Sequence, residues 1–150
     1  MTKKWIVVDL DGTLCDCSHR VHWAQAKQWD QFHAGITEDK LIEPVAHALD
    51  WLSSNYEVAL CTGRDSRHFD ATMHWLEQNG CNEFVSTLIM RPENDYSPDH
   101  ELKPNRLFEF FGSKEQALKE VEFILDDRDK VVEAWRNHGF HCWQVAAGSY

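Results

Sequence analysis

The sequence lacks a hydrophobic run of the roughly 20 residues that a membrane-spanning helix requires. It also lacks the apolar core of a signal peptide, because the N-terminal stretch MTKKW leads directly into a predicted strand. Both absences argue against a membrane-spanning or secreted protein. We therefore expect a soluble, cytoplasmic protein that has no membrane partner.

A disulfide framework is also lacking. The five cysteines are odd in number and scattered along the chain, so we expect reduced thiols. One local stretch, CDCSHRVH, gathers four residues of types that bind zinc, namely Cys15, Cys17, His19 and His22. Their spacing matches none of the usual structural zinc patterns, which favours buried thiols and solvated imidazoles over a zinc site.

Basic side chains are scarce. The chain has 15 Lys and Arg against 25 Asp and Glu, which gives a formal net charge of −10, and it has no extended basic block. Proteins that track a phosphate backbone neutralise many phosphates with clustered Lys and Arg. We therefore expect only a few placed basic side chains to bind an anionic substrate.

The composition is that of a folded domain. Hydrophobic residues make up 43% of the chain, with seven Trp and eight Phe, and 150 residues are enough to bury a core. We expect one domain over 1–150, without repeats or low-complexity segments. Most of the tryptophans are expected in the core, and their use in a homo-oligomer interface stays open.

Strand and helix patterns alternate along the chain, as they do in a mainly parallel α/β sheet flanked by helices. We expect strands over 6–8, 56–64, 84–91, 121–129 and 140–148, and helices over 19–35, 43–55, 65–80, 105–112 and 130–139. Segment 92–104 is predicted to be a loop by its prolines, Asn and Asp. Residues from about 15 to 42 form a helical insert after the first strand that would overhang the site as a small cap.

Two aspartates follow the first predicted strand, in the stretch WIVVDLDGTLCD. Ligands of open α/β sheets bind beyond the carboxyl ends of the strands, where Asp9 and Asp11 would lie. Two close carboxylates raise each other's pKa unless a cation or a shared proton offsets their charge. The pair therefore indicates a metal ion or a proton-transfer role, although Asp11-Gly12 alone would indicate only a turn.

Further polar residues end the second and fourth predicted strands or precede a predicted helix, namely Thr62, Arg64, Lys103, Asp126 and Asp127. In this order DLDGTL, CTGR, the lysine and ILDD resemble the four motifs of the haloacid dehalogenase (HAD) superfamily of phosphotransferases. The resemblance covers nearly the whole chain. It implies a HAD-like Rossmannoid fold.

Phosphoryl transfer needs an in-line nucleophile, neutralisation of the phosphoryl oxygens and a proton for the leaving group. Asp9 would be the nucleophile that forms an aspartyl-phosphate, and Asp11 would protonate the leaving oxygen and then activate water. Thr62 and Lys103 would bind the transferred phosphoryl group. Mg²⁺ is a hard cation that suits carboxylate ligands, and the candidate ligands are Asp9, Asp11, Asp126 and Asp127.

The C-terminal stretch FILDDRDKVVEAWRNHGFHCWQVAAGSY is similar to the end of the phosphatase domain of the bacteriophage polynucleotide 5'-kinase/3'-phosphatase. This resemblance implies phosphate or substrate contacts for Arg20 and Arg64, with Gly63 beside them in CTGR, and Arg91 and Arg128 are further candidates. The sequence lacks a GxxxxGK[ST] phosphate loop. A stand-alone phosphatase without the kinase half is therefore expected.

Together these patterns predict a Mg²⁺-dependent phosphatase that removes the 3'-phosphate from polynucleotide ends or 3'-nucleotides. One alternative is a phosphatase of small metabolites or 5'-nucleotides, since a fold does not define its substrate. Another is a non-catalytic phosphate-binding or receiver-like module. The acidic pair of a receiver comes before its phosphorylated strand, however, whereas here D-x-D follows the first strand directly.

Overall fold

A computed structural model describes residues 2–150 and shows a central five-stranded sheet. The strands lie in the order β5-β4-β1-β6-β7, and each neighbouring pair is parallel. Their bounds are β1 Trp5–Val8, β4 Glu57–Asp65, β5 Thr87–Arg91, β6 Val121–Asp126 and β7 Cys142–Gln144. The predicted parallel α/β sheet is confirmed, and β1, β4 and β6 are its three central strands.

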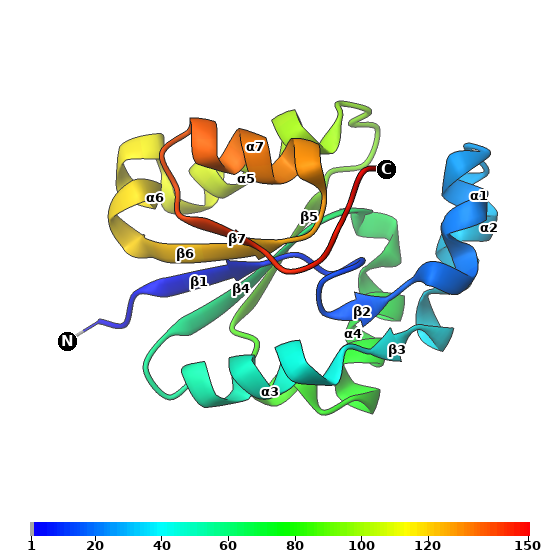
Figure 1. Cartoon of the computed structure of the whole chain (residues 1–150), viewed down its shortest axis with the longest axis horizontal. Helices are drawn as coiled ribbons and strands as arrows, with labels where there is room; N and C mark the ends of the chain where they lie inside the picture. Colours follow the sequence, from blue (N-terminus) through cyan, green and yellow to red (C-terminus); the bar gives the residue numbers. More distant parts are fainter. Residues whose placement is uncertain (1) are drawn as a thin grey trace.

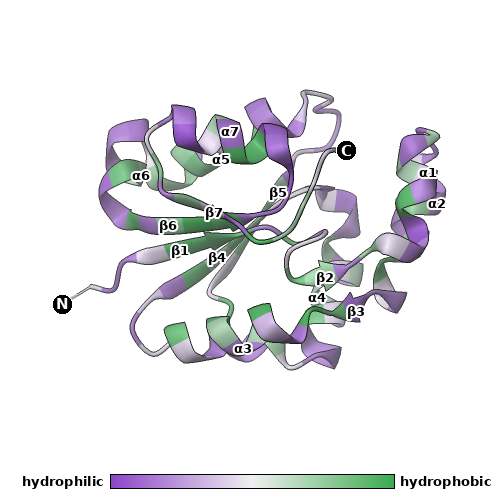
Figure 2. Ribbon diagram, in the orientation of Figure 1, coloured by the Kyte–Doolittle hydropathy of each residue, from purple (hydrophilic) through white to green (hydrophobic). Residues whose placement is uncertain are grey.

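Helices cover both faces of this sheet (Figure 1). The helices are α3 Glu43–Leu52 and α4 Phe69–Gln78 on one face, and α5 Asp99–Phe111, α6 Lys114–Glu120 and α7 Asp129–Asn137 on the other. Alternate residues of β1 serve the two layers: Ile6 and Val8 pack toward α3 and α4, and Val7 packs toward α5 to α7. Both faces of the central strands are therefore apolar (Figure 2).

The insert between β1 and β4 is built around a short antiparallel pair, β2 Cys15–Asp16 and β3 Lys40–Leu41. It carries α1 Val21–Gln25 and α2 Trp29–Ala34, which stand beyond the carboxyl ends of the central strands (Figure 1). The single helix expected over 19–35 is wrong. Lys27 has a φ of 56°, a left-handed conformation that an α-helix does not accommodate, and so the chain breaks between two short helices.

Helix α5 corrects the last part of the loop predicted over 92–104, a prediction that rested on the prolines, Asn and Asp of this segment. The helix instead begins at Asp99, directly after Pro98, and includes Pro104. Lys103 therefore lies inside a helix and not at the end of a loop, so its position relative to the sheet is set by packing.

Helix α6 was not predicted from the sequence. Ser113 caps it, with the Ser113 hydroxyl accepting a hydrogen bond from the Gln116 N–H at 3.0 Å. The spacing Ser-x-x-Gln is a capping-box pattern that identifies this start. Short 3₁₀ helices complete the chain at η1 Ser18–Arg20, η2 Ile36–Glu38, η3 Ser66–His68 and η4 Cys81–Glu83. Within residues 2–150, no helix combines the length and the apolar character needed to cross a membrane.

Candidate active site

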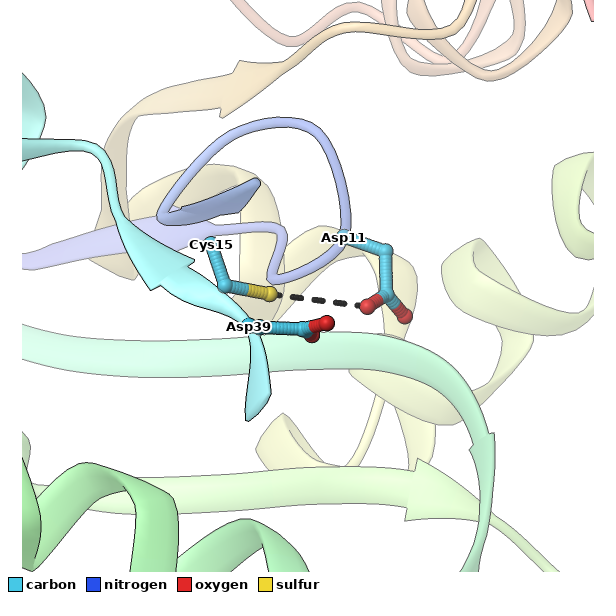
Figure 3. Close-up of side chains that lie close together, drawn as sticks. All are labelled: Asp11, Cys15 and Asp39. Atoms are coloured by element: carbon cyan, nitrogen blue, oxygen red, sulfur yellow. Dashed lines mark hydrogen bonds between the residues drawn. The ribbon is translucent and has the colours of Figure 1, made fainter. Parts of the chain in front are cut away.

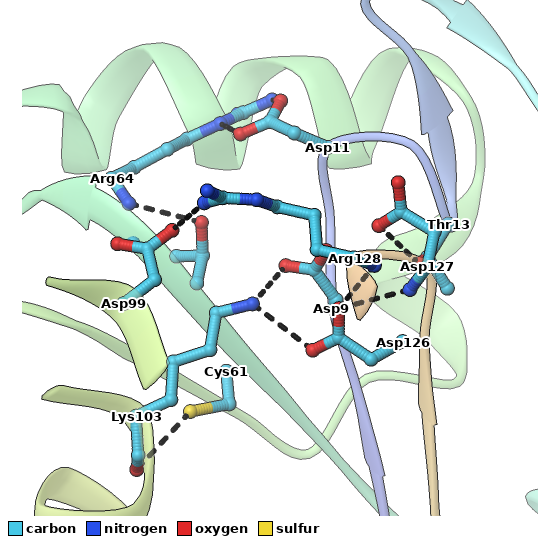
Figure 4. Close-up of polar contacts among 12 residues, drawn as sticks. Asp9, Asp11, Thr13, Cys61, Arg64, Asp99, Lys103, Asp126, Asp127 and Arg128 are labelled. Carbon is cyan, nitrogen blue, oxygen red and sulfur yellow. Dashed lines mark hydrogen bonds and ion pairs between the residues drawn. The ribbon is translucent and has the colours of Figure 1, made fainter. Parts of the chain in front are cut away.

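Three buried carboxylates meet where the central strands β1 and β6 end (Figure 4). Asp9 follows β1, and its N–H donates to the Leu125 carbonyl of β6 at 3.0 Å. Asp126 ends β6, and Asp127 follows it. Oxygens of the three side chains lie within 4.8 Å of one another. Two strands that are far apart in the sequence but adjacent in the sheet therefore create one acidic cluster.

Lys103 provides the positive charge inside this cluster. Its Nζ donates to Asp9 Oδ1 at 2.8 Å and to Asp126 Oδ2 at 3.1 Å, and only 1% of the residue is exposed. Burial lowers the pKa of Lys103, but the Asp126 and Asp9 carboxylates outweigh burial and raise it well above its usual value. The lysine is thus charged at neutral pH.

One lysine does not balance three acids. Burial, and next the Asp126 carboxylate, raise the pKa of Asp9 well above its usual value, and burial also raises the pKa of Asp127. A divalent cation would offset this surplus of negative charge. Clustered carboxylate oxygens are ligands that Mg²⁺ prefers. The donor set of Asp9, Asp126 and Asp127 therefore fits the expected metal ion.

Hydrogen bonds hold Asp126 and Asp127 in place at the carboxyl end of β6. The Asp127 N–H donates to Asp126 Oδ1 at 2.9 Å. Thr13 Oγ1 donates to Asp127 Oδ1 at 3.3 Å, and the Tyr150 hydroxyl donates to Asp127 Oδ2. Gly12 has a φ of 84°, and a Cβ there would lie 2.2 Å from Asp127 Oδ2, so only glycine fits beside the acid.

Asp11 is held by two arginines. Arg64 donates from Nε to Asp11 Oδ2 at 3.1 Å and from Nη2 to Oδ1 at 2.7 Å, and Arg20 Nη2 donates to Oδ1 at 2.7 Å. Burial alone would raise the pKa of Asp11, but the Arg64 guanidinium and then Arg20 hold it well below its usual value. In the absence of substrate, Asp11 is a carboxylate.

The Asp11 side chain does not belong to the acidic cluster of Asp9, Asp126 and Asp127, and its expected role as a metal ligand stays a prediction. It lies instead with Cys15 and Asp39 (Figure 3), and its contact with Arg64 sets it apart from Asp9 (Figure 4). The Arg20 and Arg64 guanidinium groups attract this carboxylate, whereas the acids of the neighbouring cluster repel it. The Asp11 carboxylate is thus held by two buried guanidinium groups and not by the acidic cluster.

Asp39 lies directly before β3 and completes the arginine network. Arg20 donates to it from Nε at 2.7 Å and from Nη2 at 2.6 Å, and Arg64 Nη2 lies 3.3 Å away. Both arginines are almost completely buried. The sequence analysis missed Asp39, because only the folding of the insert brings it to Arg20.

Thr62 and Gly63 lie near the carboxyl end of β4, beside this network. Thr62 is buried, and its Oγ1 accepts a hydrogen bond from the Arg64 N–H at 3.1 Å. A Cβ on Gly63 would lie 2.5 Å from the Asp99 carboxylate, so a larger residue at this position would displace Asp99. The CTGR motif therefore provides the Thr62 hydroxyl, a close approach of the Gly63 backbone to Asp99, and the buried Arg64 guanidinium.

Asp99 joins the two remaining arginine candidates at the rim. Arg91 Nη2 donates to Asp99 Oδ1 at 2.5 Å, and Arg128 Nη1 donates to Oδ2 at 2.8 Å. Asp99 begins α5 and precedes Lys103 by one helical turn, so the two share a helix face. Because this segment was predicted to be a loop, the sequence did not indicate that Asp99 and Lys103 share a helix face, and Asp99 was missed.

The four zinc candidates do not form a cluster. Cys15 and Cys17 are buried free thiols, and His19 Nε2 lies 2.8 Å from Asp39 Oδ1. Within residues 2–150, the groups of metal-ligating side chains that lie close together are Asp9, Asp126 and Asp127, and Asp11, Cys15 and Asp39. The second group already contains two arginine partners, which disfavours a cation there.

Comparison with known families decides the class of this site. A family model described as the polynucleotide kinase PNKP phosphatase domain matches residues 3–150. The chain belongs to this family. As a PNKP-type phosphatase domain it is a HAD-superfamily phosphatase, as the motifs indicated.

Solved structures agree with this assignment. The PNKP-type domain aligns with a chain of the "Pnkp1/Rnl/Hen1 RNA repair complex" at 29% identity and a TM-score of 0.80, covering 99% of this chain and 44% of that one. A chain of a "Pnkp1/Rnl/Hen1 complex" aligns at 30% identity and a TM-score of 0.78, covering 99% of this chain and 48% of that one. A haloacid dehalogenase-like hydrolase, SP0104 from Streptococcus pneumoniae, matches the fold at 14% identity and a TM-score of 0.69. The match covers 99% of this chain and 94% of that one. The PNKP-type domain thus spans less than half of the first two chains.

Proposed function

We propose that this domain is a Mg²⁺-dependent phosphatase that removes the 3'-phosphate from polynucleotide ends or 3'-nucleotides through an aspartyl-phosphate. The observation that carries the proposal is the position of Asp9. Its buried carboxylate lies at the carboxyl end of β1, paired with Lys103 and grouped with Asp126 and Asp127. Family membership supports phosphate monoesters of polynucleotides as the substrate class.

In the first step an Asp9 oxygen attacks the phosphorus, and the bond from phosphorus to the sugar oxygen breaks as the new bond forms. The Asp11 carboxyl gives its proton to the leaving sugar oxygen. In the second step water gives a proton to Asp11 and attacks the aspartyl-phosphate, which releases inorganic phosphate and restores Asp9. Lys103 and Thr62 hold the phosphoryl oxygens during both steps.

Asp9, Asp126 and Asp127 would hold Mg²⁺, which when bound neutralises charge on the transferred phosphoryl group. The protein's own part is to keep these acids in place. Asp126 is anchored by the Asp127 N–H and by Trp135 Nε1, which lies 3.4 Å from Asp126 Oδ2. Such outer hydrogen bonds orient carboxylate ligands.

Asp11 must acquire a proton to act as an acid, although Arg64 and Arg20 hold it ionised without substrate. A dianionic phosphate competes for the same guanidinium groups. As the arginines turn to the substrate, they stabilise the Asp11 carboxylate less, and the pKa of Asp11 rises. The rim arginines Arg91 and Arg128 would meet the next part of the substrate, with Gly63 allowing close approach of the backbone.

The test is phosphate release from matched substrates. A 3'-phosphorylated oligonucleotide, its 5'-phosphorylated isomer and free 3'- and 5'-nucleotides would be compared with Mg²⁺ and with EDTA. We expect release from the 3'-phosphates, loss of release in EDTA and recovery when Mg²⁺ is restored. Preference for free 5'-nucleotides would favour the small-metabolite alternative, and phosphate binding without release from any substrate would favour a non-catalytic module.

We expect Asp11→Asn to distinguish substrates by their leaving group. An asparagine has no proton to transfer, so turnover of a 3'-phosphorylated nucleotide should fall by roughly 10²–10⁴-fold. Release of p-nitrophenol from p-nitrophenyl phosphate in a single turnover should fall much less, because this leaving group needs little protonation in the first step. Single-turnover rates on both substrates measure the difference. An equal loss on both would show that Asp11 only orients Arg20 and Arg64.

A further inference from the structure

Helix α2 of the insert carries aromatic side chains at the spacing of one helix face, Trp29, Phe32 and His33. Two of them are engaged by the protein. Phe32 packs beneath the Arg20 guanidinium, whose carbon lies 4.2 Å from the ring centroid, and His33 stacks on His68 at 4.1 Å. Trp29 is the third, and 52% of it is exposed. This face therefore has an aromatic ring that the fold leaves open to solvent.

The ring of Trp29 is linked to the candidate phosphate site through Phe32 and Arg20. Its centroid lies 5.9 Å from that of Phe32, in an edge-to-face contact. Phe32 in turn contacts Arg20 by its ring and by its carbonyl, which accepts from Arg20 Nη1 at 3.1 Å. One further contact links Arg20 to Asp11. A continuous chain of contacts therefore runs from the general acid to the exposed indole.

The charge of the protein limits how it can bind the nucleotide that carries the phosphate. Acidic side chains exceed basic ones by ten, and Arg20, Arg64, Arg91 and Arg128 are already paired with carboxylates in the site. Few cations remain there to track further phosphates. Stacking of a nucleobase on an aromatic ring needs no net charge, and every base has a face that can stack.

We propose that Trp29 is a stacking platform for a nucleobase at the unpaired 3' end of the substrate. The proposal rests on the proposed function and extends it, because it names an unpaired nucleoside next to the phosphate as part of what the site recognises. A base held within a duplex already stacks on its neighbours, so the exposed indole favours a single-stranded or frayed end.

The experiment compares Trp29→Ala and Trp51→Ala with the wild type on a 3'-phosphorylated oligonucleotide and on p-nitrophenyl phosphate, which has no base. Trp51 is 84% exposed near the end of α3. Because α3 leads into the start of β4, Trp51 lies toward the amino ends of the strands, whereas the site lies at their carboxyl ends. We expect Trp29→Ala to lower kcat/KM for the oligonucleotide by roughly 5- to 150-fold, the range for one stacked base, with p-nitrophenyl phosphate unaffected. Trp51→Ala should change neither.

The Trp29→Phe variant should retain most of the wild-type activity on the oligonucleotide, since phenylalanine also stacks on bases. DNA and RNA oligonucleotides form separate arms, and both are expected to show the loss. Unchanged oligonucleotide kinetics in Trp29→Ala, or an equal loss on both substrates, would overturn the stacking role while leaving the proposed function intact. A wild-type protein that does not favour the oligonucleotide over p-nitrophenyl phosphate would contradict the proposed function itself.

Discussion

Asp9→Asn is expected to reduce phosphate release by at least about 10⁴-fold, the scale on which removal of a covalent nucleophile acts. The amide is nearly isosteric with the carboxylate but does not attack phosphorus. The loss should appear equally with oligonucleotide and aryl phosphate substrates, because both need the nucleophile. Rapid-quench or steady-state phosphate assays measure it, and release near the wild-type rate would contradict the assignment.

The same variant should fold at least as stably as the wild type when metal is removed. Asp9 belongs to a cluster in which one lysine faces three acids, so removing one negative charge relieves repulsion. We expect a Tm in EDTA equal to or above that of the wild type, and a smaller rise in Tm when Mg²⁺ is added. Asp70→Asn, at an exposed position of α4, is the matched control and should change neither turnover nor the response to Mg²⁺.

Lys103→Met is expected to reduce both turnover and stability. The change keeps the length and apolar stem of the side chain but removes the cation that contacts Asp9 and Asp126. Loss of one partner from a buried ion pair costs about 3–5 kcal/mol, and loss of a charge that stabilises the transition state costs about 10²–10³-fold in turnover. Urea unfolding in EDTA measures the first effect, with Lys114→Met on α6 as an exposed control.

The stability loss in Lys103→Met should depend on pH in a defined direction. Burial and Asp126 already raise the pKa of Asp9, and Lys103 opposes them, so the variant raises it further. A group whose pKa is higher in the folded state stabilises the fold below its unfolded pKa, about 3.9, and this contribution is lost as pH rises through the folded pKa. The deficit should therefore be largest near pH 7–8 and shrink toward pH 4. A deficit that grows on acidification would contradict this account.

The sequence alone determined the parallel sheet and the acidic residues at its strand ends. Short β-branched runs that end in Asp9 and in Asp126-Asp127 indicated buried parallel strands, and parallel strands bring their carboxyl ends to one edge. Local patterns were sufficient there because a buried strand has a continuous apolar signature. Where local rules competed, as in the segment with Pro104, the boundary of α5 was wrong.

Only the tertiary structure decided how the polar residues are divided between two sites. The spacing of Asp9 and Asp11 does not show that one faces Lys103 and the other faces Arg64, because the turn at Gly12 and the folding of the insert set those directions. Asp39 and Asp99 carry no recognisable motif, and each was found only because packing brings it to two arginines. Ion pairs between residues far apart in sequence depend on burial and distance, and neither is encoded in a local pattern.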